Sequence, residues 1–182
     1  MNNLVDNFLQ IMEFGKNYGL PFEKKRAILR EYLQSRAIEI IYLQKRSSDL
    51  IFIGGTSLRL LRGLDRFSED LDFDLTGKLD FKTIELIIKS VVDRFSKESI
   101  NIQLYRNKTP KRIYYELRFP NLLYDIKLSK NKEEKLMIKI DIEKFWQGHR
   151  KEIVLFNRYG VLANVVTASM DNILVQKISA YK

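Results

Sequence analysis

The sequence predicts an α+β fold in which helices flank a mixed or antiparallel sheet. Two kinds of hydrophobic periodicity lead to this class. Apolar residues recur at helical spacing over residues 21–46 and 80–96, whereas they alternate with polar residues over 70–75, 112–119 and 136–143. A length of 182 residues with 45% hydrophobic content is enough for a substantial core.

The first 46 residues are expected to form a helical segment that packs on the rest of the chain. Residues 1–19 carry a weak apolar stripe, and residues 21–46 carry a stronger one that begins at Pro21, a residue suited to a first helical turn. We therefore divide the chain into a segment over residues 1–46 and a main domain over residues 47–182.

A strand, a glycine turn and a brief helix follow. Residues 50–53 are apolar and end at Gly54-Gly55, as in a strand that enters a tight turn. Thr56 or Ser57 can cap the helix, and Gly63 can end it.

Alternation and turn residues define the remaining elements. They are strands over 70–75, 101–106, 112–119, 124–128 and 136–143, a helix over 80–96, turns at 120–121 and 129–135, a basic connection over 148–157, and a final helix over 170–182 that Ser169 can cap. The final helix stays in periodic register without a closing glycine or proline. We therefore expect it either to be C-terminal by nature or to belong to a longer protein.

Composition excludes several kinds of chemistry. The chain has no cysteine and one histidine, which rules out disulfides, thiolate zinc sites, Cys nucleophiles and multi-His metal sites. It has no apolar run of about 18 residues that could span a bilayer, and no N-terminal cleavage signal, so we expect a cytoplasmic protein without a membrane partner. The formal net charge of +9 favours a polyanionic partner.

Three aspartates share one face of their strand, because successive side chains of a strand point to opposite faces. Asp70, Asp72 and Asp74 repel one another unless a cation lies between them, and Mg²⁺ prefers such oxygen ligands. A carboxylate on a later strand would complete the site. Asp141 suits either a metal ligand or a base that activates an attacking hydroxyl, and Asp125 is the alternative.

The glycines upstream predict a seat for phosphate groups. Gly54 and Gly55 allow backbone N–H groups to approach a ligand closely, and a helix start at Ser57 offers a positive dipole end. Thr56 and Ser57 add hydroxyl donors. Together with Mg²⁺, this combination points to phosphoryl or nucleotidyl transfer.

Other site classes fit this stretch less well. A Walker phosphate loop needs Gly-Lys-Ser/Thr after the glycines, and a calcium loop needs Gly and Glu where Leu75 and Phe81 stand. The run DFDLT at 72–76 resembles the aspartyl-nucleophile signature of haloacid-dehalogenase-type phosphatases, although RFSED precedes it in place of a very apolar strand. An acidic strand edge without a ligand is the remaining alternative, and it would leave like charges uncompensated.

The stretch IGGTSLRLLRGLDRFSEDLDFDL, residues 53–75, closely resembles the first motif of the AbiEii/AbiGii toxin family of bacterial nucleotidyltransferases. That family belongs to the DNA polymerase β-like nucleotidyltransferase superfamily. The resemblance covers residues 20–182 and implies a nucleotidyltransferase core, a mixed or antiparallel sheet flanked by helices, with N-terminal helices and a C-terminal helix. Family members usually continue into a further helical domain, which we expect to be absent from this chain.

Carried over position by position, the resemblance implies Mg²⁺, or Mn²⁺, bound by Asp70, Asp72 and Asp141, with Asp141 also helping to deprotonate the acceptor hydroxyl. It further implies a set of nucleotide-binding residues. Arg66 and Ser68 would shape the loop that presents the aspartates, and the contacts to the NTP would come from Gly54, Gly55, Thr56 and Ser57. Lys177, in QKISA, takes a family lysine position from which it would reach a phosphate or carboxylate, and a surface lysine is the alternative.

The implied function is that of a toxin in a toxin–antitoxin or phage abortive-infection system, with an NTP as donor and an RNA, the tRNA 3′ end, as acceptor. A cognate antitoxin protein would be its partner. Transfer to a protein or small-molecule hydroxyl is one alternative, and a catalytically silent module that binds nucleic acid or antitoxin is another. RNA agrees with a cluster of basic residues and tyrosines. It comprises Arg106, Lys108, Lys111, Arg112, Arg118, Lys127, Lys130, Lys132, Lys135, Tyr105, Tyr114, Tyr115 and Tyr124.

Overall fold

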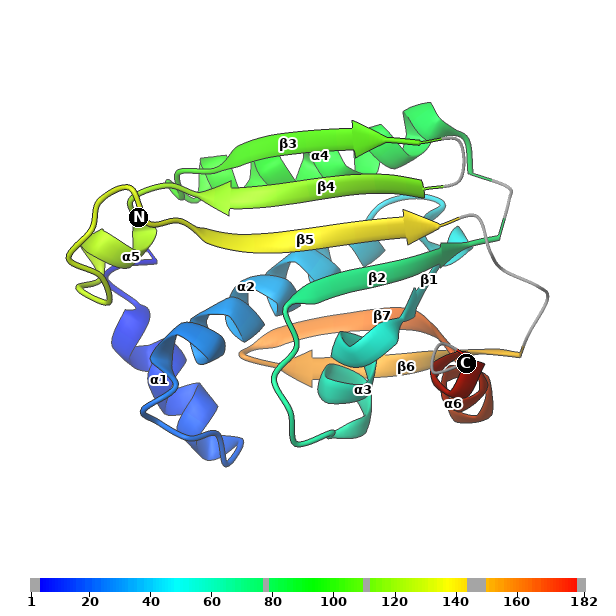
Figure 1. Ribbon diagram of the computed structural model, residues 1–182, viewed down its shortest axis with the longest axis horizontal. Helices are drawn as coiled ribbons and strands as arrows, with labels where there is room; N and C mark the ends of the chain where they lie inside the picture. Colours follow the sequence, from blue (N-terminus) through cyan, green and yellow to red (C-terminus); the bar gives the residue numbers. More distant parts are fainter. Residues whose placement is uncertain (1–3, 77–78, 110–111, 144–149, 180–182) are drawn as a thin grey trace.

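The computed structural model describes residues 4–76, 79–109, 112–143 and 150–179, without the side chains of Gln176, Lys177 and Ser179. Within these residues, one mixed sheet of seven strands has the order β3-β4-β5-β2-β1-β7-β6. Helices lie on both sides of it (Figure 1). The α+β class and the mixed sheet predicted from the sequence are confirmed.

The elements of the described residues have the following bounds. The strands are β1 Leu50–Ile53, β2 Asp70–Leu75, β3 Gln103–Lys108, β4 Arg112–Phe119, β5 Leu136–Glu143, β6 Lys151–Arg158 and β7 Val161–Ala168. The helices are α1 Phe8–Asn17, α2 Lys25–Tyr42, α3 Gly54–Arg62, α4 Phe81–Lys97, α5 Leu122–Asp125 and α6 Met170–Ser179, with a short 3-10 helix, η1 Ser47–Asp49, before β1.

The centre of the sheet places β2 between β5 and β1. Strand β2 pairs parallel with β5 and antiparallel with β1, and β1 pairs parallel with β7. The antiparallel pairs β3–β4 and β6–β7 form the two ends of the sheet. Because α3 connects β1 to β2, the glycines and the acidic strand lie side by side.

One face of the sheet packs against α2 and α4, and α1 packs on α2. Alternate strand residues are buried there, among them Phe52, Phe73 and Phe119. Phe95 of α4 packs edge to face on Phe119, with ring centroids 5.6 Å apart. Since strand side chains alternate, the intervening polar residues point to the opposite face.

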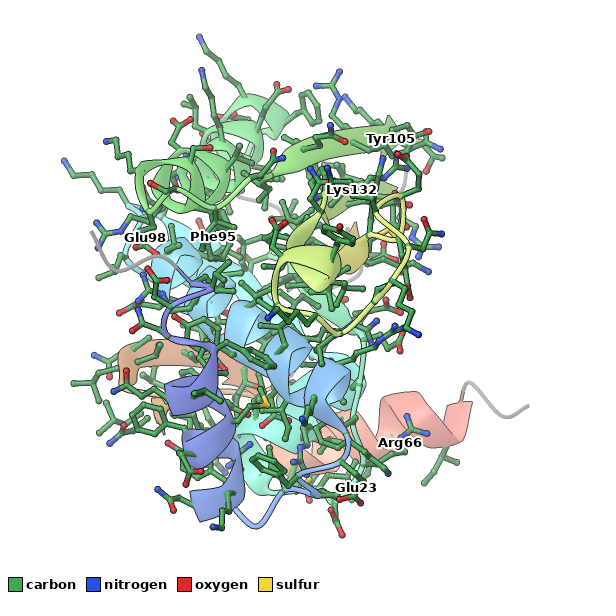
Figure 2. All side chains as sticks on the ribbon, turned by 90° about the vertical axis from the view of Figure 1, so that its left-hand side faces the viewer. Glu23, Arg66, Phe95, Glu98, Tyr105 and Lys132 are labelled. Carbon is green, nitrogen blue, oxygen red and sulfur yellow. The ribbon has the colours of Figure 1, made fainter. Side chains whose placement is uncertain are left out.

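The opposite face is polar over β2, β3, β4 and β5, and we call this region the polar face. Helices α3 and α6 pack beside it at β1 and β7, where Ile51, Leu58, Val166, Ala168 and Ile173 form a small second core. In the edge-on view of Figure 2, Arg66, Tyr105 and Lys132 lie toward the side of the polar face, whereas Phe95 and Glu98 lie toward the other side.

The helices predicted over 21–46 and 80–96 are confirmed as α2 and α4. At the start of α4, Asp80 Oδ1 accepts a hydrogen bond from the Thr83 amide at 2.7 Å. Residues 1–3 and 180–182 of the two predicted terminal helices lie outside the described residues. In the part of the chain that is described, no helix has the length and apolar character needed to cross a membrane.

Two predicted segments are wrong. Over 124–128 the chain forms the end of α5 and a turn instead of a strand, since Asn121 and Lys127 adopt left-handed backbone angles with φ of 62° and 59°. In place of the predicted connection over 148–157, strand β6 begins at Lys151 and pairs with β7. Strand β7 was not predicted from the sequence either.

Candidate active site

Helix α3 begins where β1 ends, at Gly54. This glycine has a φ of 77°, a left-handed angle that suits glycine, and Ile53 is the N-cap residue. The prediction that Thr56 or Ser57 caps the helix is therefore wrong, because the helix has already begun. Gly63 ends α3 with a φ of 72°, as predicted.

The first two residues of α3 are glycines because other side chains crowd them. A Cβ at Gly54 would lie 2.8 Å from Asp72 Cγ, and a Cβ at Gly55 would lie 3.0 Å from Ser68 Oγ and 3.7 Å from Arg66 Nη2. The start of α3 thus meets Asp72, Ser68 and Arg66 together. Backbone N–H groups, the helix dipole and a guanidinium make this position suitable for an anion such as a phosphate.

The two hydroxyls at the start of α3 are buried and directed at the main chain. Ser57 Oγ donates to the Gly54 carbonyl at 2.9 Å, and Thr56 Oγ1 donates to the Asp70 carbonyl. Their exposed fractions are 1% and 0%. Thr56 therefore connects α3 to the first residue of β2.

The carboxylates predicted to act together are neighbours on the polar face. Asp72 and Asp141 are register partners on the adjacent parallel strands β2 and β5, which lie about 4.8 Å apart. Asp70 precedes Asp72 on the same face and is paired with Lys139. Asp74 is the next carboxylate along β2, is 3% exposed, and is paired with Glu143 of β5.

The structure places Asp141, and not Asp125, beside the aspartates of β2. Asp125 is exposed on α5, where it lines a shallow depression with Leu4 and Pro120. The topology explains this placement, since β5 pairs with β2 and α5 does not belong to the sheet.

Asp141 forms an ion pair with Arg112 of β4. Asp141 Oδ1 accepts a hydrogen bond from Arg112 Nε, and Asp141 Oδ2 forms an ion pair with Arg112 Nη2. Arg112 Nε also lies 3.8 Å from Glu143 Oε1. The Arg112 side chain is 51% exposed, so the guanidinium that neutralises Asp141 is itself largely in contact with solvent.

Tyr114 and Glu116 of β4 belong to the site, and the sequence did not single them out together. Tyr114 is the register partner of Asp141, and its hydroxyl donates to Glu116 Oε1 at 2.6 Å. Burial, the Glu116 hydrogen bond and the nearby Asp70 charge raise the pKa of Tyr114 to about 12. The same hydrogen bond lowers the pKa of Glu116, to which Arg118 also contributes. The alternation of polar and apolar residues in β4 places Tyr114 and Glu116 on the polar face, and this pattern could have identified them from the sequence.

The donor set of Asp70, Asp72 and Asp141 fits a hard divalent cation, because it offers carboxylate oxygens from two adjacent strands. As they stand, no three Asp, Glu, His or Cys side chains of the described residues converge closely enough to hold a metal ion. If Arg112 moved away, the carboxylate oxygens of Asp141 would become available to bind a metal ion. Lys177 belongs to α6, but its side chain lies outside the described residues, so its predicted role stays a prediction.

Two solved structures from Helicobacter pylori have this nucleotidyltransferase-like fold. One, described as a candidate nucleotidyltransferase, has a TM-score of 0.54 and 21% sequence identity and covers 84% of this chain. The other, the protein JHP933, has a TM-score of 0.51 and 23% identity and covers 85% of this chain. The matches span 57% and 56% of those proteins, so this chain has a little over half their length.

The sequence also matches a family, the nucleotidyl transferase AbiEii toxins of type IV toxin–antitoxin systems, over residues 36–182. The chain belongs to this family, and the resemblance seen in residues 53–75 is confirmed. A search of curated proteins finds no match.

Proposed function

We propose that this chain transfers a nucleoside monophosphate from an NTP to an RNA acceptor, the tRNA 3′ end, with Mg²⁺ or Mn²⁺ bound by Asp70, Asp72 and Asp141. One observation carries the proposal: the register of β2 and β5 puts Asp72 beside Asp141, directly against the glycine start of α3. Membership of a toxin–antitoxin family adds a cognate antitoxin as the protein partner.

Each part of the site has a separate task in this reaction. The start of α3, with Gly54, Gly55 and Arg66, binds the triphosphate oxygens. The metal, when bound, supplies positive charge against the transferred phosphate and the leaving pyrophosphate. Asp141 accepts the proton of the acceptor hydroxyl, which requires that Arg112 has moved off it.

The polar face supports a single-stranded RNA as acceptor. The registers of β2, β5, β4 and β3 align Asp70, Lys139, Glu116 and Tyr105 in one row that runs from the carboxylates to the sheet edge. Tyr105 is 45% exposed and lies under the Arg118 guanidinium at 4.8 Å. Exposed aromatic rings beside cations are typical of surfaces that stack unpaired bases.

A second exposed tyrosine beside a cation lies beyond the sheet. Tyr124 is 44% exposed, with Lys132 Nζ at 5.5 Å from its ring centre. Tyr115 does not belong to this surface, as its ring is fully buried, and that part of the predicted set is wrong. The net charge of +9 is consistent with a polyanionic acceptor.

A labelling experiment tests the proposed reaction. The protein is incubated with Mg²⁺ or Mn²⁺, one radiolabelled NTP at a time, and total bacterial RNA. We expect label in the tRNA fraction. Label in protein or in small molecules would instead favour the alternative acceptors, and no label with any NTP would favour a silent binding module.

Asp72→Asn tests whether the carboxylates perform the chemistry. Because the metal loses a charged ligand, labelling should fall at least about a hundredfold, with the circular dichroism spectrum unchanged. Asp93→Asn, an exposed aspartate of α4 on the other side of the sheet, is the matched control and should label like wild type. Full activity of Asp72→Asn would contradict the proposal.

A further inference from the structure

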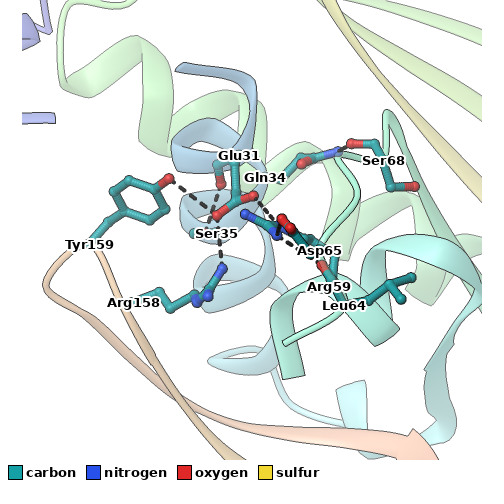
Figure 3. Close-up of polar contacts among 9 residues, drawn as sticks. All are labelled: Glu31, Gln34, Ser35, Arg59, Leu64, Asp65, Ser68, Arg158 and Tyr159. Carbon is teal, nitrogen blue, oxygen red and sulfur yellow. Dashed lines mark hydrogen bonds and ion pairs between the residues drawn. The ribbon is translucent and has the colours of Figure 1, made fainter. Parts of the chain in front are cut away.

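Behind the candidate site, α2 carries a buried polar cluster that the proposed reaction does not use (Figure 3). Glu31 is 2% exposed and accepts hydrogen bonds from Arg59 Nε at 2.8 Å, Arg158 Nη1 at 2.8 Å and the Tyr159 hydroxyl at 3.2 Å. A buried carboxylate needs such partners. Through them, α2 is tied to α3 and to the turn between β6 and β7.

Arg59 extends this cluster into the connection between α3 and β2, residues 63–69. Its Nη1 donates to the Leu64 carbonyl at 2.8 Å and lies 3.7 Å from Asp65 Oδ1. Its guanidinium carbon is 5.0 Å from the ring centre of Phe67. The connection that Arg59 holds is the one that carries Arg66 and Ser68 to Gly55.

Gln34 holds the other end of the same connection. Its Nε2 donates to the carbonyls of Ser68 at 3.1 Å and Glu69 at 2.9 Å, and the side chain is 1% exposed. The next carbonyl, that of Asp70, accepts from Thr56 Oγ1. Side chains of α2 and α3 thus hold the three consecutive carbonyls of Ser68, Glu69 and Asp70, two residues ahead of Asp72, and we call this arrangement the carbonyl clamp.

We propose that Gln34 is a positioning residue: through the carbonyl clamp it fixes the backbone at Ser68 and Glu69, and thereby sets where Asp70 and Asp72 stand against the start of α3. The inference rests on the proposed function for its metal-binding consequence. Gln34 precedes residue 36, where the family match begins, so the matched region does not include it. Small shifts of catalytic groups have large effects on rate, which gives the clamp a functional role.

Gln34→Met tests the clamp, because it keeps the length and apolar bulk of the side chain and removes the two donated hydrogen bonds. The matched control is Gln44→Met, since Gln44 Nε2 donates to Ile40 O at 3.0 Å, a local contact far from the connection. Circular dichroism confirms folding. If Gln34→Met does not fold, Gln34→Asn withdraws the amide by one methylene and gives the same readouts.

Three readouts separate positioning from general stability. Hydrogen exchange of the amides over residues 66–72 should become about tenfold faster in Gln34→Met and not in the control. Calorimetric Mn²⁺ affinity of the nucleotide-free chain should weaken about fivefold, because the ligating carboxylates are less well placed. In the labelling reaction, kcat should fall about tenfold with KM for the NTP nearly unchanged.

Two results would overturn this inference: exchange over 66–72 that stays at the wild-type rate, or faster exchange accompanied by wild-type Mn²⁺ affinity and kcat. A wild-type chain that binds no Mn²⁺ has a different meaning. That result counts against the proposed metal site, and the exchange measurement still decides whether Gln34 holds the connection.

Discussion

Two carboxylates of this chain, Glu31 and Asp141, are both neutralised by arginine, but their cations are held differently. Glu31 is 2% exposed, and its partners Arg59 and Arg158 are 5% and 17% exposed. Asp141 is 12% exposed, whereas its partner Arg112 is 51% exposed. The arginines of Glu31 are buried with it, and the arginine of Asp141 extends from solvent.

This difference separates a carboxylate of the scaffold from one that is available to a ligand. Removing one member of a buried pair costs about 3–5 kcal/mol, so Glu31 keeps its partners. In the Asp141 pair the arginine is open to solvent, which brings the contribution closer to the about 0–1 kcal/mol of exposed pairs, so Arg112 can leave more easily than Arg59 or Arg158. Asp141 can therefore exchange its guanidinium for another cation, and Glu31 cannot.

Glu31→Gln should have the largest effect on stability. Two arginines would lose their buried counter-charge, and the free energy of unfolding should fall by about 3 kcal/mol. Urea unfolding followed by circular dichroism measures the change. Glu152→Gln is the control, because Glu152 is 35% exposed and pairs with Arg62 at 2.6 Å, and it should cost less than about 1 kcal/mol. Equal losses in the two variants would contradict the comparison.

Arg112→Gln should have an intermediate effect, and it should increase the affinity for a metal ion. Without the competing guanidinium, Asp141 is available to a metal, and Mn²⁺ should bind up to about fivefold more tightly, a gain of at most about 1 kcal/mol. Isothermal titration calorimetry of the nucleotide-free chain measures it. Weaker Mn²⁺ binding in this variant would show that Arg112 supports the cation site and does not compete with it.

Tyr114→Phe should have the smallest effect, and it should depend on pH. The Tyr114 hydroxyl lowers the pKa of Glu116, so its contribution, about 1 kcal/mol, is present above the ordinary glutamate pKa and is lost as the pH falls through the lowered value. The two proteins should therefore differ in urea unfolding at neutral pH and converge in acid. A difference that stays constant down to acid pH would rule out this linkage.

Local patterns predicted much of the candidate site. Strict alternation placed Asp70 and Asp72 on one face and Asp141 on the polar face of another strand. The two glycines were predicted to form a turn before the helix, whereas α3 begins at Gly54 itself. The pairing of β2 with β5 could not be predicted in this way, because the local periodicity of apolar residues does not determine the order of strands in a sheet. The choice between Asp125 and Asp141 needed that topology.

The parts that the sequence did not predict depend on contacts between distant residues. Glu31 and Arg158 are 127 positions apart, and no pattern within α2 indicates a buried ion pair. Strand β6 was missed because it lies at the sheet edge, where Ile153 and Leu155 are 72% and 64% exposed and charged residues flank them. For Thr56, a contact to the NTP stays a prediction, and its hydroxyl contacts the Asp70 carbonyl.

The contact between Gly54 and Asp72 has a genetic consequence. Every other amino acid brings a Cβ atom, which at this position would lie 2.8 Å from Asp72 Cγ. The substituted residue would also have to adopt a φ of 77°. Under the proposed function, any missense change at this codon disarms the toxin. A population that has lost its antitoxin should therefore recover growth through several different missense alleles of this one codon, which sequencing of such survivors would detect.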